Sequence, residues 1–334
     1  MKKFLKILVY TCLSLITILL IAVIIKLSFF GKIFDKHKAE EFLLPSTNKK
    51  NIRLTFLGTS CFIIDYKGKQ FVNDPYFSNQ DFPSIIKGKT PLEKLSNFLP
   101  DSLYNNISLI SITHGHFDHC MDIGTFLQKN TAVIADSSVF YQLNQLIPDN
   151  TKKHQLHYQP YANWIYSSDS TFRVFTILSH HGPHFGHTVL FNGSFHQPLA
   201  SPPHYLWDWQ LGSGNYSYLV DVMDADSIVF RMAFLAGDIH DEEYKKIDSI
   251  YSEKRCDIFS LVFWKRKLNE SQIDVGEKHT KADIILLNHW NNFFSRQEKP
   301  LEEIRTSKIL EILSDKKDKQ TPCYIMLPFT SVAL

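Results

Sequence analysis

The sequence predicts an α/β body in which helices cover β-sheets, preceded by an N-terminal helix that crosses a membrane. Three observations predict this: a long apolar run at the N-terminus, many short apolar segments separated by turn residues, and helical patterns between the later segments. The chain has 334 residues, 44% of them hydrophobic, and a formal net charge of +2. That composition allows a full-sized core, and the balanced charge argues against a nucleic-acid partner.

The N-terminal helix is predicted from the apolar run Ile7–Ile25, which is long enough to cross a bilayer. The residues that follow, LSFFGKIF, contain no small-residue cleavage site. An uncleaved anchor at residues 1–30 is therefore favoured over a cleaved signal peptide or a buried core helix. Three lysines before the run favour an inner N-terminus, although four lysines between residues 26 and 38 compete with them. We expect a single-pass protein whose body lies on the outer side.

Residues 31–51 are charged at first and then contain Pro, Ser and Asn, which is typical of a linker. From residue 52 onward there is no further linker, repeat or low-complexity segment. The sequence therefore predicts one domain at residues 52–334. The five cysteines of the whole chain are scattered and form no C-x-x-C pair, which argues against a zinc finger or a disulfide scaffold.

The domain begins with three short apolar segments, RLTFLG, CFIID and KQFVND, whose separation by tight turns predicts neighbouring antiparallel strands. Later strands are expected at ISLISI, AVIAD, FRVFTIL, YSYLVDV, IVFRMAFLA, DIFSLVF, DIILL and CYIML. Helices are expected at PLEKLSNFL, MDIGTFLQ, HDEEYKKIDSIYSEK and PLEEIRTSKILEIL.

A cluster of candidate metal ligands, THGHFDHC, follows the buried strand ISLISI. His114 and His116 are two positions apart, so on an extended segment both side chains point to one side and can bind one metal ion. Asp118 and His119 fall where the chain turns toward a helix, and they can face a second ion. Imidazole nitrogen and carboxylate oxygen are ligands that suit Zn²⁺ or iron. A polar loop whose histidines only cap a helix is the disfavoured alternative.

Further ligands are expected at the ends of later strands, where active sites of α/β proteins form. One apolar segment runs into His180 and His181, another into Asp238, and a third into His289. Taken alone, Asp238 could be a helix cap and His289 a structural residue. Their order behind the cluster favours a shared site. Tyr205, Trp207 and Trp209 lie in an aromatic, Pro- and Gly-rich stretch that is expected either to line this site or to pack on the surface, two alternatives of equal weight.

The motif THGHFDH resembles the HxHxDH signature of the metallo-β-lactamase superfamily, and the opening segment RLTFLGTSCFIIDYKGKQFVNDPYF is similar to the first strands and Asp-Pro turn of that superfamily. The resemblance covers about residues 52–330 and is strongest to the branch of ascorbate-6-phosphate lactonases and N-acylphosphatidylethanolamine-hydrolysing phospholipase D. It implies a four-layer αβ/βα sandwich with metal ions at one edge.

The resemblance also implies a ligand arrangement. The first ion would be held by three histidines, the second by two histidines and a carboxylate, and one aspartate would bridge them. The residues in those places are His114, His116 and His181, then Asp118, His119 and His289, with Asp238 as the bridge. His181 is preferred over His180 because it lies two residues beyond the small residue that ends its strand, and His184 is a third candidate. This chain departs from the branch at Gly58-Thr59-Ser60 and at Gly237-Asp238-Ile239-His240, which leaves the ligands intact and the substrate open.

The predicted function is hydrolysis by a hydroxide shared between two divalent ions, with Zn²⁺ favoured over Mn²⁺ or Fe²⁺. Asp118 is expected to orient that hydroxide and handle its proton, while His184 and His240 are candidate hydrogen-bond donors to the substrate. The expected substrate is a small or lipid-like molecule, a phosphodiester or a lactone or other ester. The alternative from another class is a metal-binding membrane protein without catalysis, acting as a sensor or scaffold.

Overall fold

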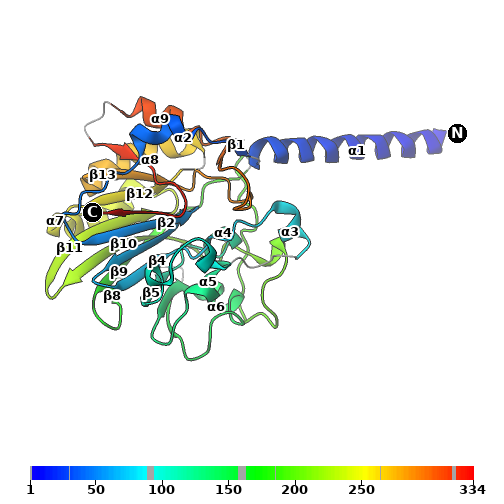
Figure 1. Ribbon diagram of the computed structural model, residues 1–334. Coiled ribbons are helices and arrows are strands. Elements are labelled where there is room, and N and C mark those ends of the chain that lie inside the picture. Colours follow the sequence, from blue (N-terminus) through cyan, green and yellow to red (C-terminus); the bar gives the residue numbers. More distant parts are fainter. Residues whose placement is uncertain are drawn as a thin grey trace.

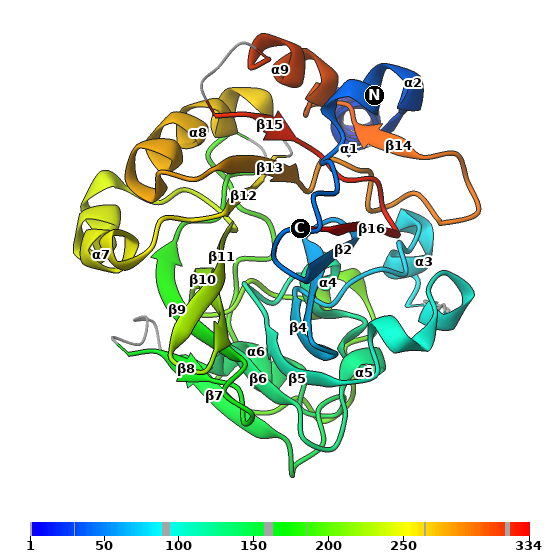
Figure 2. The ribbon, with the colours of Figure 1, turned by 60° about the vertical axis from the view of Figure 1, so that its left-hand side comes forward.

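The computed structural model of the protein contains two seven-stranded sheets that lie face to face, with helices on the outer face of each (Figure 1 and Figure 2). It describes residues 2–29, 31–88, 94–156, 163–184, 186–263, 265–317 and 321–334. The layers therefore follow the order helix, sheet, sheet, helix, and the predicted α/β sandwich is confirmed.

The first sheet has the strand order β16-β2-β3-β4-β5-β6-β7. Its strands are β2 (Ile52–Gly58), β3 (Cys61–Tyr66), β4 (Lys69–Asn73), β5 (Ile107–Ser111), β6 (Ala132–Asp136), β7 (Lys152–Leu156) and β16 (Thr330–Ala333). The first three are antiparallel, as the tight turns between them predict, and β4 to β7 run parallel. Four short helices cover its outer face: α3 (Phe82–Ile86), α4 (Phe117–Cys120), α5 (Ile123–Phe126) and α6 (Ser137–Gln142).

The second sheet has the strand order β15-β13-β12-β11-β10-β9-β8. Its strands are β8 (Ile165–Tyr166), β9 (Phe172–Ser179), β10 (Asn215–Asp224), β11 (Ser227–Leu235), β12 (Ile258–Val262), β13 (Ile284–Asn288) and β15 (Cys323–Tyr324). Strands β8 to β11 are antiparallel, whereas β11, β12, β13 and β15 are parallel. The parallel connections include α7 (Asp241–Glu253), α8 (Arg266–Thr280) and α9 (Ile309–Asp315), which cover the outer face.

The core lies in three layers because the strands alternate the direction of their side chains. Ile64 and Phe71 face the opposite sheet, whereas Ile63 and Val72 face the short helices, and all four are buried. Since both faces of each sheet are covered, the strands read as near-continuous apolar runs. This is why their positions could be predicted from the sequence.

Three predicted helices differ from the structure. The helix expected at residues 300–313 is split into β14 (Glu302–Ile304) and α9, because residues 302–304 pair with β1 (Gly31–Ile33). The helix expected at residues 91–99 begins outside the described residues, and its described part forms one 3₁₀ turn. The one expected at residues 121–128 is reduced to the four residues of α5. The 3₁₀ turns of the described chain are η1 (Glu40–Phe42), η2 (Leu95–Asn97), η3 (Asp101–Leu103) and η4 (Leu206–Asp208).

The membrane anchor predicted at residues 1–30 is wrong. The residues that the structure describes there form α1 (Lys2–Phe29), which extends away from the body (Figure 1). Within the described parts of the chain, no helix combines the length and the apolar character needed to cross a bilayer. The single-pass topology, the outer-side location of the body and the membrane as a partner all depended on that anchor and are corrected with it.

The segment predicted as a linker, residues 31–51, packs on the second sheet and its helices. After β1, the short helix α2 (Lys36–Ala39) is N-capped by Asp35, whose carboxylate accepts a hydrogen bond from the Lys38 amide. Phe34 and Phe42 are buried in the core beneath α7 to α9. Two large apolar side chains therefore fix a segment whose charged composition suggested a free stalk.

Candidate metal centre

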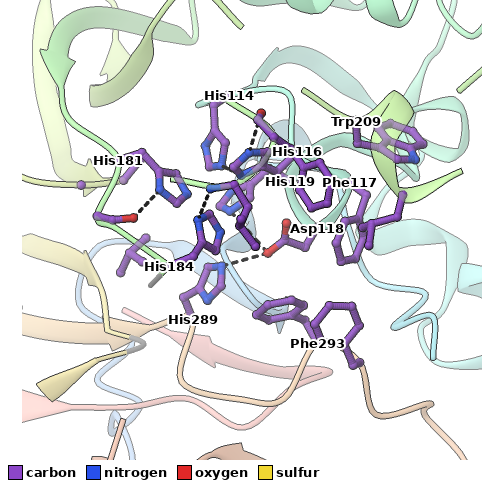
Figure 3. A pocket seen from close by; sticks show the side chains of 18 of the residues that line it. His114, His116, Phe117, Asp118, His119, His181, His184, Trp209, His289 and Phe293 are labelled. Carbon is purple, nitrogen blue, oxygen red and sulfur yellow. Dashed lines mark hydrogen bonds and ion pairs between the residues drawn. The ribbon is translucent and has the colours of Figure 1, made fainter. Parts of the chain in front are cut away.

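The predicted site residues lie on loops that leave the strands at one edge of the sandwich. The loop after β5 carries the cluster of residues 114–119, the loop after β9 carries His181, and the loop after β13 carries His289. Figure 3 shows these side chains converging on one cavity. Strands from both sheets contribute, so the site forms only when the two sheets pack together.

The first group of candidate ligands consists of His114, His116 and His181, whose ligand atoms all lie within 4.8 Å of one another. His114 Nε2 and His116 Nδ1 are 3.0 Å apart. The ring of His181 lies 4.8 Å from that of His114 and 4.9 Å from that of His116, measured between centroids. The structure thus brings together the two histidines of the motif and the downstream histidine preferred from the sequence.

The second group consists of Asp118, His119 and His289, again with ligand atoms within 4.8 Å of one another. Asp118 Oδ2 lies 3.2 Å from His289 Nε2 and 3.7 Å from His119 Nε2. The rings of His114 and His119 are 4.0 Å apart, so the two groups are adjacent. All three side chains of the second group are buried.

Asp74 is a site residue whose place in the sequence indicated only an Asp-Pro turn. Its carboxylate is fully buried and lies 2.8 Å from His119 Nδ1. It also accepts hydrogen bonds from the backbone N–H of Thr113 at 2.7 Å and from the Thr113 hydroxyl. Because a carboxylate only accepts, the Nδ1 of His119 donates and its Nε2 presents a lone pair to the cluster. The signal in the sequence was an Asp-Pro pair directly after a buried strand.

The electrostatics of the site follow from burial and mutual repulsion. Burial, reinforced by neighbouring imidazoles, holds the pKa of His114 well below its ordinary value and lowers that of His116 to about 4. Burial acts to raise the pKa of Asp118, but the charge of His119 and the hydrogen bond from His289 outweigh it, so the pKa lies below the usual range. For His119, burial is outweighed by Asp74 and Asp118, which raise the pKa.

Hydrogen bonds fix which ring nitrogen of a histidine carries hydrogen, and the other nitrogen then has a lone pair that can bind a metal ion. The carbonyl oxygen of Gly182 accepts from His181 Nδ1 at 2.7 Å, and that of Phe191 accepts from His116 Nε2 at 3.3 Å. His116 Nδ1 therefore carries a lone pair and faces His114 Nε2. Two neutral imidazoles at that separation need a proton or a cation between them. His289 Nδ1 is also buried without a hydrogen-bond partner.

Asp238, the predicted bridging residue, belongs to neither group, although it lines the same cavity. Its backbone forms a two-way hydrogen-bonded bridge with His180, each N–H donating to the other's carbonyl at 2.8 Å. His180 is exposed, and its ring packs 5.1 Å from that of His240, which is exposed as well. His240 is absent from the residues that line the cavity.

His184, the other predicted substrate-binding residue, does line the cavity, and its ring lies 4.9 Å from that of His181. Its Nδ1 accepts a hydrogen bond from the Leu190 N–H at 3.0 Å, which leaves Nε2 to carry the hydrogen. Burial and the nearby His116 lower the pKa of His184 to about 3. The Nζ of Lys265 donates hydrogen bonds to the backbone oxygens of Pro183, at 2.7 Å, and His184, at 2.5 Å. This loop is therefore fastened to the start of α8.

The loops that carry the ligands are held in place where the backbone of one loop passes very close to the backbone of another. A Cβ atom on Gly115 would lie 2.3 Å from the backbone oxygen of Gln210, and one on Gly237 would lie 2.2 Å from that of His180. Only glycine allows either contact. His289 has a φ of 58°, in the left-handed region, while its N–H donates to the Thr59 carbonyl at 2.6 Å. The turn at residues 58–60 therefore supports the backbone of His289.

The cavity has a volume of about 1180 Å³, open solvent at its mouth included. Apart from the two groups, its walls are mainly apolar, formed by Phe82, Phe117, Leu190, Phe191, Leu206, Trp209, Ala236, Val262, Phe293 and Phe294. The aromatic stretch after His184 contributes Trp209 but not the pair Tyr205 and Trp207, which stack on each other at the surface. Phe293 and Phe294 were not predicted, since a Phe pair in a loop has no signal of its own.

Part of the chain matches the model of a known protein family. A model described as the beta-lactamase superfamily domain matches residues 53–196, which include the ligand cluster. Over that segment the chain is similar to the beta-lactamase superfamily. A solved structure described as a possible metal-dependent hydrolase from Veillonella parvula is similar to this chain, with a TM-score of 0.53 at 12% identity, and the match covers 84% of this chain and 99% of the other. At that identity the likeness shows the fold alone.

Two curated relatives of this chain are named UPF0173 metal-dependent hydrolase. The one from Aeropyrum pernix is 35% identical over 78 residues, which is 23% of this chain and 26% of the relative. The one from Carboxydothermus hydrogenoformans is 29% identical over 106 residues, or 32% of this chain and 39% of the relative. The matches thus span well under half of either relative's length.

Proposed function

We propose that the protein is a metal-dependent hydrolase that acts on an ester-type bond with two divalent ions, of which Zn²⁺ is the favoured identity. The observation that carries this proposal is the pair of adjacent ligand groups, one of three imidazoles and one of two imidazoles and a carboxylate, facing one cavity. The curated relatives named as metal-dependent hydrolases support it.

The proposed ligands are His114, His116 and His181 for one ion and Asp118, His119 and His289 for the other. Bound there, the ions would supply Lewis acidity and lower the pKa of a water molecule toward neutrality. Imidazole and carboxylate ligands at this ratio suit Zn²⁺, Mn²⁺ or Fe²⁺. Because Asp238 lines the same cavity, it stays the proposed bridging residue.

The protein's own side chains supply the remaining chemistry. The carboxylate of Asp118 is ionised because its pKa is held low, so it can accept a hydrogen bond from the attacking water and orient it. The Nε2–H of His184 can donate a hydrogen bond to a substrate oxygen on which negative charge develops. The apolar walls exclude water from the reacting bond. A phosphodiester and a lactone or other ester both suit this chemistry.

The proposal is tested with the His116→Ala variant, with His240→Ala as the matched control, because His240 is an exposed histidine outside the cavity. We expect His116→Ala to lose bound metal and turnover by at least a hundredfold while it stays folded, and His240→Ala to keep both. Metal content and hydrolysis of phosphodiester and ester panels are the measurements. A His116→Ala variant with full activity would disprove the assigned site, and wild-type protein that binds metal without any turnover would favour a sensor or scaffold.

A further inference from the structure

One wall of the cavity is built from four phenylalanines, Phe82, Phe117, Phe293 and Phe294, here called the aromatic wall. Phe294 contacts the other three, with ring centroids 4.6 Å from Phe293, 5.2 Å from Phe82 and 5.5 Å from Phe117. The residues come from α3, α4 and the loop after β13. Offset and edge-to-face packing of this kind makes a firm apolar surface.

The aromatic wall lies beside the second ligand group. The ring of Phe293 is 5.2 Å from that of His289, and Phe117 directly precedes Asp118 in the chain. Figure 3 shows Phe117 and Phe293 on the side of Asp118 that faces away from His181. A substrate whose reacting bond lies at the ligand groups can therefore place a neighbouring apolar group against this wall.

Part of the surface of the aromatic wall remains accessible from the cavity. Phe117 and Phe293 are buried, but Phe82 and Phe294 are only half-buried and line the cavity. Apolar surface that faces a concave cavity gains free energy when a hydrocarbon group covers it. Leu206 and Trp209 extend the same apolar lining.

Among the described residues that line the cavity, none offers a side-chain cation to a second anionic group. Its lining, as far as the chain is described, includes neither lysine nor arginine. Lys265 lies nearby, but its ammonium donates to the backbone carbonyls of Pro183 and His184. Charged headgroups are normally bound by Lys or Arg, and an anion against apolar walls would lose hydration without compensation.

From these observations we infer that the substrate is a neutral carboxylic ester or lactone with a hydrocarbon acyl chain or ring, and that the aromatic wall binds this acyl part; the inference rests on the proposed hydrolase function. In the reaction, the oxygen of water forms the new bond to the acyl carbon and the ester C–O bond breaks. The leaving alcohol oxygen takes up a proton of that water, so the products are a carboxylic acid and an alcohol. Phe294 is then a specificity-determining residue.

The test measures kcat/KM of the metal-loaded full chain for ethyl esters from acetate to octanoate, alongside bis(p-nitrophenyl) phosphate. We expect kcat/KM to rise by about fourfold per added methylene until the wall is covered. In Phe294→Ala, the ratio of kcat/KM for octanoate to kcat/KM for acetate should be at least tenfold smaller than in the wild type. Phe98→Ala is the control, because Phe98 is a half-buried phenylalanine on the same core that does not line the cavity.

A second readout is independent of turnover. Calorimetric binding of octanamide to the metal-free chain should be at least tenfold tighter than that of acetamide, and Phe294→Ala should remove the difference. If Phe294→Ala does not fold, Phe294→Leu should show a smaller change in the same direction. No length dependence in the wild type, or an equal loss in Phe98→Ala, would overturn the inference. Preferred cleavage of the phosphodiester would overturn it while the hydrolase proposal stands, and no cleavage of either class would defeat both.

Discussion

Replacing Asp74 by Asn tests whether a buried carboxylate fixes the orientation of a metal ligand. Asp74 accepts hydrogen bonds from Thr113 and lies 2.8 Å from His119 Nδ1. An Asn side chain has nearly the same shape, but one carboxylate oxygen is replaced by an NH₂ group. That NH₂ group donates a hydrogen bond to His119 Nδ1, whereas the carboxylate oxygen accepted one from it. His119 would then carry its hydrogen on Nε2, the nitrogen that faces Asp118 at 3.7 Å, and could no longer bind an ion through it.

The expected magnitude is a tenfold to hundredfold loss of affinity at the second ligand group, about 1.4–2.7 kcal/mol, which is typical for the partner of a metal-binding histidine. The assay is competition with a chelator for bound metal, in which the affinity of each of the two ions is measured separately. Asp136→Asn is the control, since Asp136 is also buried and accepts backbone hydrogen bonds, from Ser138 and Ser213, without a histidine. Wild-type affinity for both ions in Asp74→Asn would refute the reasoning.

Three further predictions concern the surroundings of the site. Lys265→Met should raise KM several-fold with less effect on kcat, because the loop carrying His184 loses two hydrogen bonds; unchanged steady-state kinetics would contradict this. Arg231→Met should lower the free energy of unfolding by about 3 kcal/mol in urea titrations, because it removes one of the two arginines that pair with the buried Asp221. Burial raises the pKa of Asp122 from 3.8 to about 6. The folded state thus binds this proton more tightly, and the metal-free chain should lose on the order of 3 kcal/mol as pH rises from about 4 to 6, a slope that Asp122→Asn should remove in denaturation midpoints.

The ligand cluster could be located from the sequence because its signal is local. His114, His116, Asp118 and His119 stand within six positions, directly after a buried strand, so one loop places them together. Strands could also be located, since sheets covered on both faces give long apolar runs. His181 and His289 needed the additional expectation that strand ends gather at one edge of the sandwich.

What the sequence could not predict depends on contacts between distant segments. The helix expected at residues 300–313 was lost because residues 302–304 pair with a strand more than two hundred positions earlier in the chain. The aromatic wall combines Phe82 with Phe294, two residues whose separate neighbourhoods look like ordinary loops. Asp238 lines the same cavity as the ligand groups, and its backbone pairing with His180 is a long-range contact that its local sequence did not indicate.

The contact between Phe34 and Trp290 bears on how the protein should be shortened for study. Trp290 follows His289 directly and is fully buried, and its ring lies 4.4 Å from that of Phe34. A chain expressed from residue 52, the domain start suggested by composition, would lack β1 and Phe34. The indole of Trp290 would then be exposed to water, one position from the candidate ligand His289. Expression from residue 31 would keep the covering intact. The metal affinity measured on the chain that starts at residue 52 would therefore reflect the exposure of Trp290 as well as the affinity of the intact ligand groups.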